Sequence, residues 1–131
     1  MAHTFKYQTI GSSKLPRPFI PLTLRHKDRI VKIKALVDSG ADFCMFDGEL
    51  AHILDIDLTK HEKINVNGVT GKATCYVVHI EIGVEGKFFP SPAIFSFEFS
   101  PDEFGGLAGQ LGFFDTFTVE FNRKVMNVIL K

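Results

Sequence analysis

Hydrophobic and polar residues alternate along much of the chain, which is the pattern of strands that are buried on one face. Residues 19–24 and 30–37 form one pair of such segments, and the polar stretch "RHKD" separates them. The second segment, "IVKIKALV", alternates at first and becomes fully apolar toward its end. This pattern predicts a β-hairpin whose second strand runs from the surface into the centre of the fold.

More strands are expected on both sides of this hairpin. Residues 63–99 are rich in β-branched and aromatic residues, and turn pairs such as Asn-Gly interrupt them. Two closing strands joined at "NRK" are expected near the C-terminus. In residues 1–18, "HTFKYQTI" fits an edge or interface strand and "GSSKLPRP" fits a loop.

Helices have a small share in this pattern. The segment "DGELAHILDID" is the best candidate, since Asp47 can cap its N-terminus and Leu50, Ile53 and Leu54 share one face. A second short helix is expected after Gly112. The fold class is therefore mostly β with one or two short helices, arranged as a small closed barrel or a sandwich.

Composition narrows the class of protein. The 131 residues, 45% of them hydrophobic, suffice for a single domain with one core. The formal net charge is zero, which gives no basic surface for nucleic acid and favours self-association. No segment fits a signal peptide or approaches the roughly 18–20 apolar residues that span a bilayer. We expect a cytoplasmic protein that binds neither nucleic acid nor membranes.

The sequence offers no pattern for a metal or a cofactor. Its five histidines show no HExxH or comparable spacing, and "GGLAGQLG" lacks the GxGxxG order of a dinucleotide site. Cys44 and Cys75 form no CxxC pair, so we expect two reduced thiols. Any catalysis would have to come from the protein's own side chains.

One short stretch, "VDSGAD", carries the candidate chemistry at the end of the apolar strand. Asp38 supplies a carboxylate, Ser39 a hydroxyl, and Gly40 lets backbone approach closely because it has no Cβ. Ala41 leaves room for a substrate backbone, and Asp42 adds a second, more peripheral acceptor. Taken alone, the tetrapeptide fits a structural turn equally well.

The stretch occurs only once in the chain. Peptide hydrolysis without a metal or a covalent nucleophile needs two acids that differ in protonation. Two carboxylates in contact cannot both ionise, so such a pair shares one proton. One chain thus holds half of such a site, and a symmetric homodimer would bring Asp38 together with its copy.

The segment "ALVDSGADFCMF" resembles the active-site segment of the retropepsin-like aspartic proteases, the single-lobe relatives of pepsin. Three further pieces follow the family's order: "PFIPLTL", "VNGVTGKATCYVVHIEI" and "GLAGQLGFFDTFTVEFNRKVMNVIL". The resemblance covers residues 19–131 and is greatest to microbial stand-alone members and the ubiquitin-shuttle type. It implies a single protease domain over residues 1–131, with a closed barrel of the retropepsin type.

The resemblance also implies roles for residues. Asp38 would be the catalytic aspartate, and Ser39 would make interlocking hydrogen bonds beneath the pair. Gly40 would hold backbone near the catalytic water. Ala41 and Asp42 would contact the main chain of the substrate.

The other matched pieces imply a flap and a supporting segment. Val69, Thr70 and Gly71 would lie at or near the tip of a flap that closes over the peptide. Gly112 would pack behind the active-site loop, and Phe113 would stand where many viral members have Arg. The chemistry predicted is a cofactor-independent aspartic endopeptidase that acts on a peptide or protein substrate and prefers apolar residues at the cut.

Alternatives remain open at this point. The same fold could bind an extended peptide by β-augmentation without cutting it. It could also be a proteolytic domain that processes its own parent polyprotein. For the dimer, residues 5–10 and 125–130 are apolar and alternating, and we expect them to pair across the twofold axis.

Overall fold

The computed structural model describes residues 2–68, 71–99, 101 and 104–131. Strands dominate these residues, and the two α-helices among them are short. The elements in chain order are β1 (His3–Lys6), β2 (Phe19–His26), β3 (Arg29–Val37), β4 (Cys44–Asp47), α1 (Glu49–Ile53), a 3-10 turn (Leu58–Lys60), β5 (Glu62–Gly68), β6 (Gly71–Val84), β7 (Lys87–Ser96), β8 (Gly106–Ala108), α2 (Phe113–Thr116), β9 (Val119–Asn122) and β10 (Asn127–Leu130).

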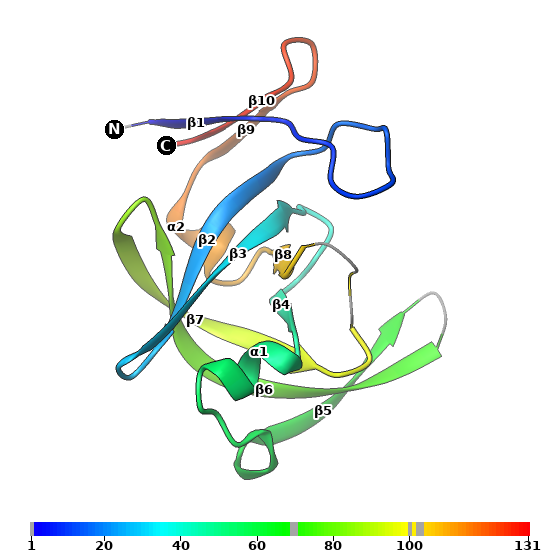
Figure 1. The fold of residues 1–131 in the computed structure, drawn as a ribbon, viewed down its shortest axis with the longest axis vertical. Coiled ribbons are helices and arrows are strands. Elements are labelled where there is room, and N and C mark those ends of the chain that lie inside the picture. Colours follow the sequence, from blue (N-terminus) through cyan, green and yellow to red (C-terminus); the bar gives the residue numbers. More distant parts are fainter. Residues whose placement is uncertain (1, 69–70, 100, 102–103) are drawn as a thin grey trace.

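Six strands form a closed barrel in the order β2-β3-β8-β4-β7-β6. The ring closes because β6 pairs back onto β2, with Thr23 opposite Gly83 and Arg25 opposite Glu81. β5 lies outside this ring and pairs with β6 as a long hairpin that extends away from the barrel (Figure 1). The expected fold class, a small closed β-barrel with short helices, is confirmed.

The barrel interior follows from the alternation of the sequence. Leu22 and Leu24 in β2 point inward and are buried, while the alternating residues Pro21 and Thr23 are more exposed. β3 becomes buried at Ala35 and Val37, where its sequence turns fully apolar, so it runs into the core as predicted. Burying each such leucine or valine side chain contributes about 1.5–3 kcal/mol to stability.

The helices match the predictions in part. The N-cap residue of α1 is Gly48 and not Asp47 as expected, although the Asp47 carboxylate accepts a hydrogen bond of 3.0 Å from the N–H of the first helical residue, Glu49. Leu54 is fully buried, but Ile53 is 50% exposed, so its predicted place on the buried face is wrong. α1 has only five residues, and Ala51 takes the inward position instead.

The terminal strands pair differently from the prediction. β1 pairs with β10 of the same chain, and β10 pairs on its other edge with β9. Both edges of β10 are therefore occupied within one chain, and the strand pairing that was expected across a twofold axis forms within the chain, between residues 3–6 and 127–130. The loop between β1 and β2 permits this because its Gln8–Arg17 bridge folds it back on itself. The two chain ends consequently lie side by side (Figure 1).

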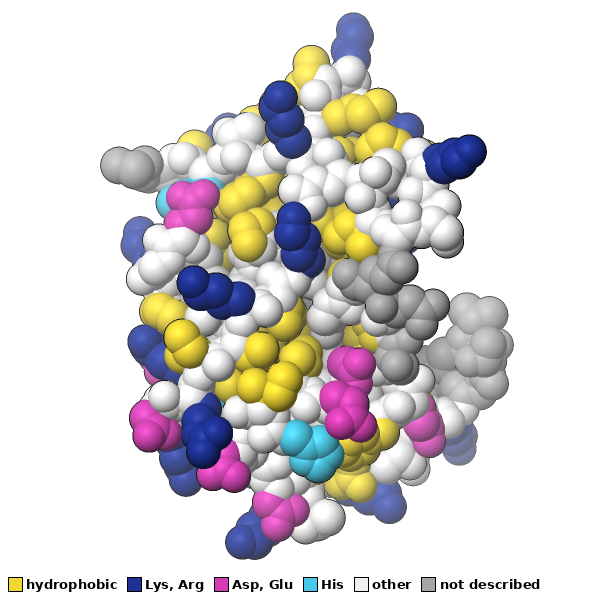
Figure 2. Space-filling model, viewed as in Figure 1, with side chains coloured by type: hydrophobic (Ala, Val, Ile, Leu, Met, Phe, Trp, Pro, Cys, Tyr) yellow, Lys and Arg dark blue, Asp and Glu magenta, His cyan; other side chains and the backbone are white. Residues whose placement is uncertain are grey.

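The surface mixes charged and apolar side chains. Figure 2 shows acidic and basic side chains interspersed over the lower half of one face, with hydrophobic groups exposed between them. Val125 and Met126, in the turn that joins β9 and β10, are 61% and 39% exposed. Within the part of the chain that the structure describes, no helix has the length and apolarity needed to cross a membrane.

Candidate active site

Asp38 is the first residue beyond β3. Its backbone N–H donates to the carbonyl oxygen of Ala108 at 3.0 Å, directly after Val37 and Ala108 pair in the parallel β3–β8 ladder. The carboxylate therefore leaves the barrel where the C-terminal ends of two parallel strands meet. Its side chain is partly buried, and the fully apolar end of β3 fixes its starting point.

A tight turn follows and returns to the carboxylate. The Gly40 N–H donates to Asp38 Oδ1 at 2.9 Å, and the Ala41 N–H donates to the Asp38 carbonyl at 3.2 Å. A Cβ on Gly40 would lie 3.3 Å from the same carboxylate oxygen, so glycine allows the close approach. The turn thus orients the acid through its own backbone, while Ser39 and Gly40 remain exposed.

A second segment, which follows β8, supports this turn from behind. The Gln110 N–H donates to the Ala41 carbonyl at 2.8 Å, and the Leu111 N–H donates to the Asp42 carbonyl at 2.9 Å. The Gln110 side-chain amide donates to the Ser39 carbonyl at 2.7 Å. Sequence reasoning did not single out Gln110, because its role depends on a contact between distant parts of the chain.

The glycine behind the active-site loop is Gly109, not Gly112 as the resemblance implied. A Cβ on Gly109 would stand 2.3 Å from the Phe43 carbonyl oxygen and 2.7 Å from the Ala41 carbonyl oxygen. A Cβ on Gly112 would instead meet the Ser91 hydroxyl at 1.9 Å. Both positions exclude a larger residue, but only the Cβ added at Gly109 would meet the backbone of the turn that follows Asp38.

This correction also changes the residue that follows that glycine. Gln110 takes the place that the resemblance assigned to Phe113, and Phe113 is instead a fully buried core residue. Its ring packs 5.3 Å from that of Phe117. Among the described residues, no cationic side chain forms an ion pair with Asp42, which is exposed at the end of the turn.

A cavity of about 240 Å³ lies beside the turn. Its lining combines residues of the active-site loop with apolar side chains of the barrel and of the β5–β6 hairpin: Gly40, Ala41, Asp42, Phe43, Met45, Val66 and Leu107. Val66 brings the predicted flap hairpin to the candidate site. Of the predicted flap residues, Gly71 begins β6 opposite Gly68, while Val69 and Thr70 lie outside the described residues.

The cysteines do not form a thiol site. Cys44 is fully buried behind the turn, where its Sγ accepts from the Gly109 N–H at 3.4 Å. Burial raises the pKa of the Cys44 thiol and that of the Cys75 thiol, which is also fully buried. A neutral thiol is a poor nucleophile, so Cys44 acts in packing rather than in catalysis.

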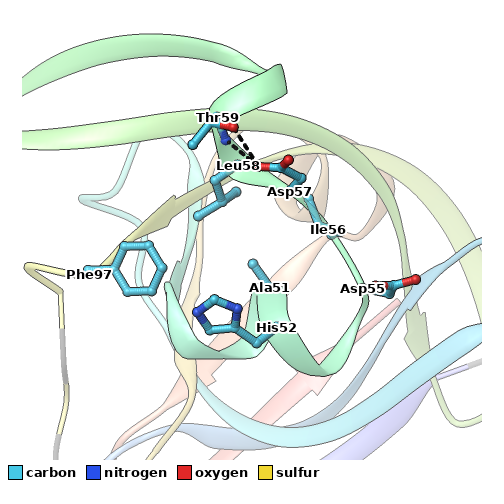
Figure 3. A pocket seen from close by; sticks show the side chains of 8 residues that line it. All are labelled: Ala51, His52, Asp55, Ile56, Asp57, Leu58, Thr59 and Phe97. Atoms are coloured by element: carbon cyan, nitrogen blue, oxygen red, sulfur yellow. Dashed lines mark hydrogen bonds between the residues drawn. The ribbon is translucent and has the colours of Figure 1, made fainter.

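A larger cavity of about 360 Å³ opens elsewhere, between α1, the 3-10 turn and Phe97 (Figure 3). The His52 ring packs 5.6 Å from the Phe97 ring at its side. The Asp57 carboxylate is occupied as a cap, accepting from both the hydroxyl and the N–H of Thr59, and these bonds lower its pKa. This cavity shares no lining residue with the Asp38 turn, and within the described ranges no His, Cys, Asp and Glu side chains cluster as metal ligands.

Comparison with known proteins supports the fold. No protein-family model and no curated protein matches the sequence. Among solved structures, a retropepsin-like aspartic protease from Rickettsia conorii is similar over 99% of this chain and 98% of its own, with a TM-score of 0.71 and 21% identity.

Two further structures have lower similarity. The retroviral protease-like domain of Ddi1 from Leishmania major gives a TM-score of 0.56 at 16% identity, over 90% of this chain and 96% of that one. The EIAV protease complexed with the inhibitor HBY-793 gives a TM-score of 0.54 at 16% identity, over 76% of this chain and 86% of that one. The chain therefore has the fold of the retropepsin-like aspartic proteases.

Proposed function

We propose that the protein is an aspartic endopeptidase that acts as a homodimer. The observation that carries this proposal is the Asp38 carboxylate, which a glycine turn holds at the end of β3 beside a cavity lined by Val66 of the β5–β6 hairpin. One chain contributes one such carboxylate. A second copy, related by a twofold axis, supplies the other acid that the reaction needs.

In this mechanism the two Asp38 side chains hold one water molecule and share one proton. The ionised carboxylate takes a proton from the water as the water attacks the scissile carbonyl carbon. The protonated carboxyl donates a hydrogen bond to the carbonyl oxygen and stabilises the charge that develops there. A proton then passes to the leaving nitrogen, and the C–N bond breaks without a covalent enzyme intermediate.

The neighbouring residues have supporting roles in the proposal. Ser39 makes hydrogen bonds beneath the pair, and Gly40 brings backbone close to the water. Ala41 and Asp42 contact the substrate main chain, since both line the cavity beside the turn. Val69, Thr70 and Gly71 contact the bound peptide in this proposal, and the β5–β6 hairpin closes over it and excludes water.

The substrate in this proposal is an extended peptide with apolar side chains near the cut. Phe43, Met45, Val66 and Leu107 give the cavity an apolar lining suited to such a side chain. The rival function is a module that binds the same kind of peptide without cutting it. Because each chain holds only one aspartate in such a glycine turn, Asp38, a protein that stays monomeric would favour this rival.

Cleavage of an unstructured protein tests the proposal. Casein would be incubated with the wild type and with Asp38→Asn from pH 3 to pH 8, and a pepstatin-type inhibitor would be added in parallel. We expect cleavage by the wild type that the inhibitor blocks and that Asp38→Asn lacks while its fold is retained. A folded, dimeric wild type that binds casein and leaves it intact would favour the binding module.

A further inference from the structure

The peptide unit between Ser39 and Gly40 is hydrogen-bonded at both of its polar ends. Its N–H, on Gly40, donates to Asp38 Oδ1 at 2.9 Å. Its C=O, on Ser39, accepts from the Gln110 side-chain amide at 2.7 Å. A single amide thus connects Gln110 to the candidate catalytic carboxylate through two consecutive hydrogen bonds.

Two such bonds on one amide strengthen each other. A donor on the carbonyl oxygen draws electron density away from the N–H and makes it a better donor. It also fixes the plane of the peptide, which decides whether the Gly40 N–H points at the carboxylate. A glycine-containing turn depends on such outside support, because glycine itself restricts the backbone least.

The Gln110 side chain starts from a fixed position. Its own N–H is bonded to the Ala41 carbonyl at 2.8 Å, and the next N–H, of Leu111, is bonded to the Asp42 carbonyl at 2.9 Å. Gly109 packs directly against the backbone of residues 41–43. These backbone contacts hold the turn without the Gln110 side chain, so the side-chain amide adds orientation rather than the fold of the loop.

We propose that Gln110 is a positioning residue, which orients and polarises the Ser39–Gly40 amide toward the Asp38 carboxylate. This inference rests on the proposed aspartic protease function. Gln110 does not line the cavity beside the turn, so its action on the reaction passes through the amide and not through substrate contact. The hydrogen bond it strengthens favours the ionised carboxylate, which takes the proton from the water.

The test compares Gln110→Met with the wild type. Met fills a similar volume but has no donor for the Ser39 carbonyl. We expect this variant to move the acidic limb of the pH–rate profile upward. We also expect kcat to fall roughly tenfold with KM nearly unchanged, because substrate contacts are kept.

Gln8→Met is the matched control, since Gln8 is the other glutamine of the chain and its amide oxygen accepts from Lys34 instead. We expect the wild-type profile for it. If Gln110→Met lowers activity without moving the acidic limb, the residue has only a structural role and the inference is wrong. The same holds if KM rises and kcat does not change.

A second readout separates this inference from the proposed function. Carbon-13 NMR of aspartate carboxyl groups, with the Asp38 signal assigned through Asp38→Asn, follows the titration without any substrate. We expect its midpoint to move upward in Gln110→Met and to stay in Gln8→Met. If the wild type cleaves nothing and the Asp38 midpoint still moves in Gln110→Met, the protease proposal alone is overturned. An unmoved midpoint in a cleaving enzyme would overturn the role of Gln110 alone.

Discussion

Gly109 packs against Phe43 so closely that a Cβ on the glycine would lie 2.3 Å from the Phe43 carbonyl oxygen. Neither the carbonyl nor the barrel strand behind it can move away without displacing the Asp38 turn. Gly86 offers a contrast, because its φ of +82° favours glycine while nothing lies within 4 Å of an added Cβ. An alanine at position 109 would therefore clash with neighbouring atoms, whereas an alanine at position 86 would only strain the backbone.

We expect Gly109→Ala to destabilise the protein by about 3 kcal/mol through overpacking. We expect Gly86→Ala to cost about 1 kcal/mol through its left-handed backbone alone. Urea unfolding of both variants measures this difference, and the proposed cleavage activity should be lost only in Gly109→Ala. Equal stabilities together with equal activities would mean that Gly109 does not support the turn.

The Asp57 cap gives a pH dependence with a definite sign. Its hydrogen bonds with the Thr59 hydroxyl and N–H lower the pKa of Asp57 in the folded state, so the folded protein favours the ionised form. The cap's contribution to stability is therefore present above the ordinary pKa of an aspartate and is lost as the pH falls through the lowered value. We expect Asp57→Ala to lower the urea midpoint at pH 7 and to differ less from the wild type near pH 3.

An alanine variant of another exposed acid, Asp28→Ala, serves as the control for general charge effects. A gap between Asp57→Ala and the wild type that stays constant from pH 7 to pH 3 would contradict the capping role. The comparison needs no activity assay, so it tests this part of the structure independently of the proposed function.

Both cysteines should react slowly in the folded protein. Burial raises the pKa of Cys44 and of Cys75, and it also keeps a reagent from their sulfurs. We expect almost no reaction with a thiol reagent such as DTNB at pH 7.5 in buffer and two equivalents in guanidinium chloride. Rapid modification of Cys44 in the folded protein, with loss of activity, would point to a thiol nucleophile and away from Asp38.

Mixed dimers test whether the site needs two chains. Suppose that each active site needs Asp38 from both copies. Wild type and Asp38→Asn are then mixed in equal amounts, and after random exchange about one quarter of all dimers contain two wild-type chains and are active. Independent sites would leave about one half of the activity of wild type alone at the same total concentration. Cleavage measured after the chains have been mixed and equilibrated distinguishes these values, and an Asp28→Asn mixture gives the reference.

The sequence was sufficient where the determining interactions are local. The hairpin of β2 and β3 and the glycine turn after Asp38 depend on neighbouring residues, and both were predicted. The resemblance then supplied the closed barrel, because alternation alone fits a barrel and a sandwich equally well. Ile53 was misplaced because a helix of five residues has too few turns for a heptad-like face to settle its orientation.

The parts that sequence reasoning missed depend on contacts between distant segments. An apolar residue directly precedes both Gly109 and Gly112, so the local sequence does not distinguish them. The parallel pairing of β3 with β8 decides which glycine meets the active-site loop. Gln110 was overlooked for the same reason. The intramolecular pairing of β1 with β10 was also out of reach, since an alternating terminal strand suits its own sheet and a partner's equally well.

The closure of the barrel has a consequence for how the protein folds. β2 and β6 meet through residues such as Thr23 and Gly83, which lie far apart in the sequence, so this seam forms only after a large loop has lost its entropy. Folding should therefore be slow for the size of the chain, on a scale of milliseconds to seconds. β6 also forms a hairpin with β5, and β5 brings Val66 to the candidate site. Because β6 takes part in both the barrel seam and this hairpin, we expect the cavity beside Asp38 to reach its final shape only when the barrel closes.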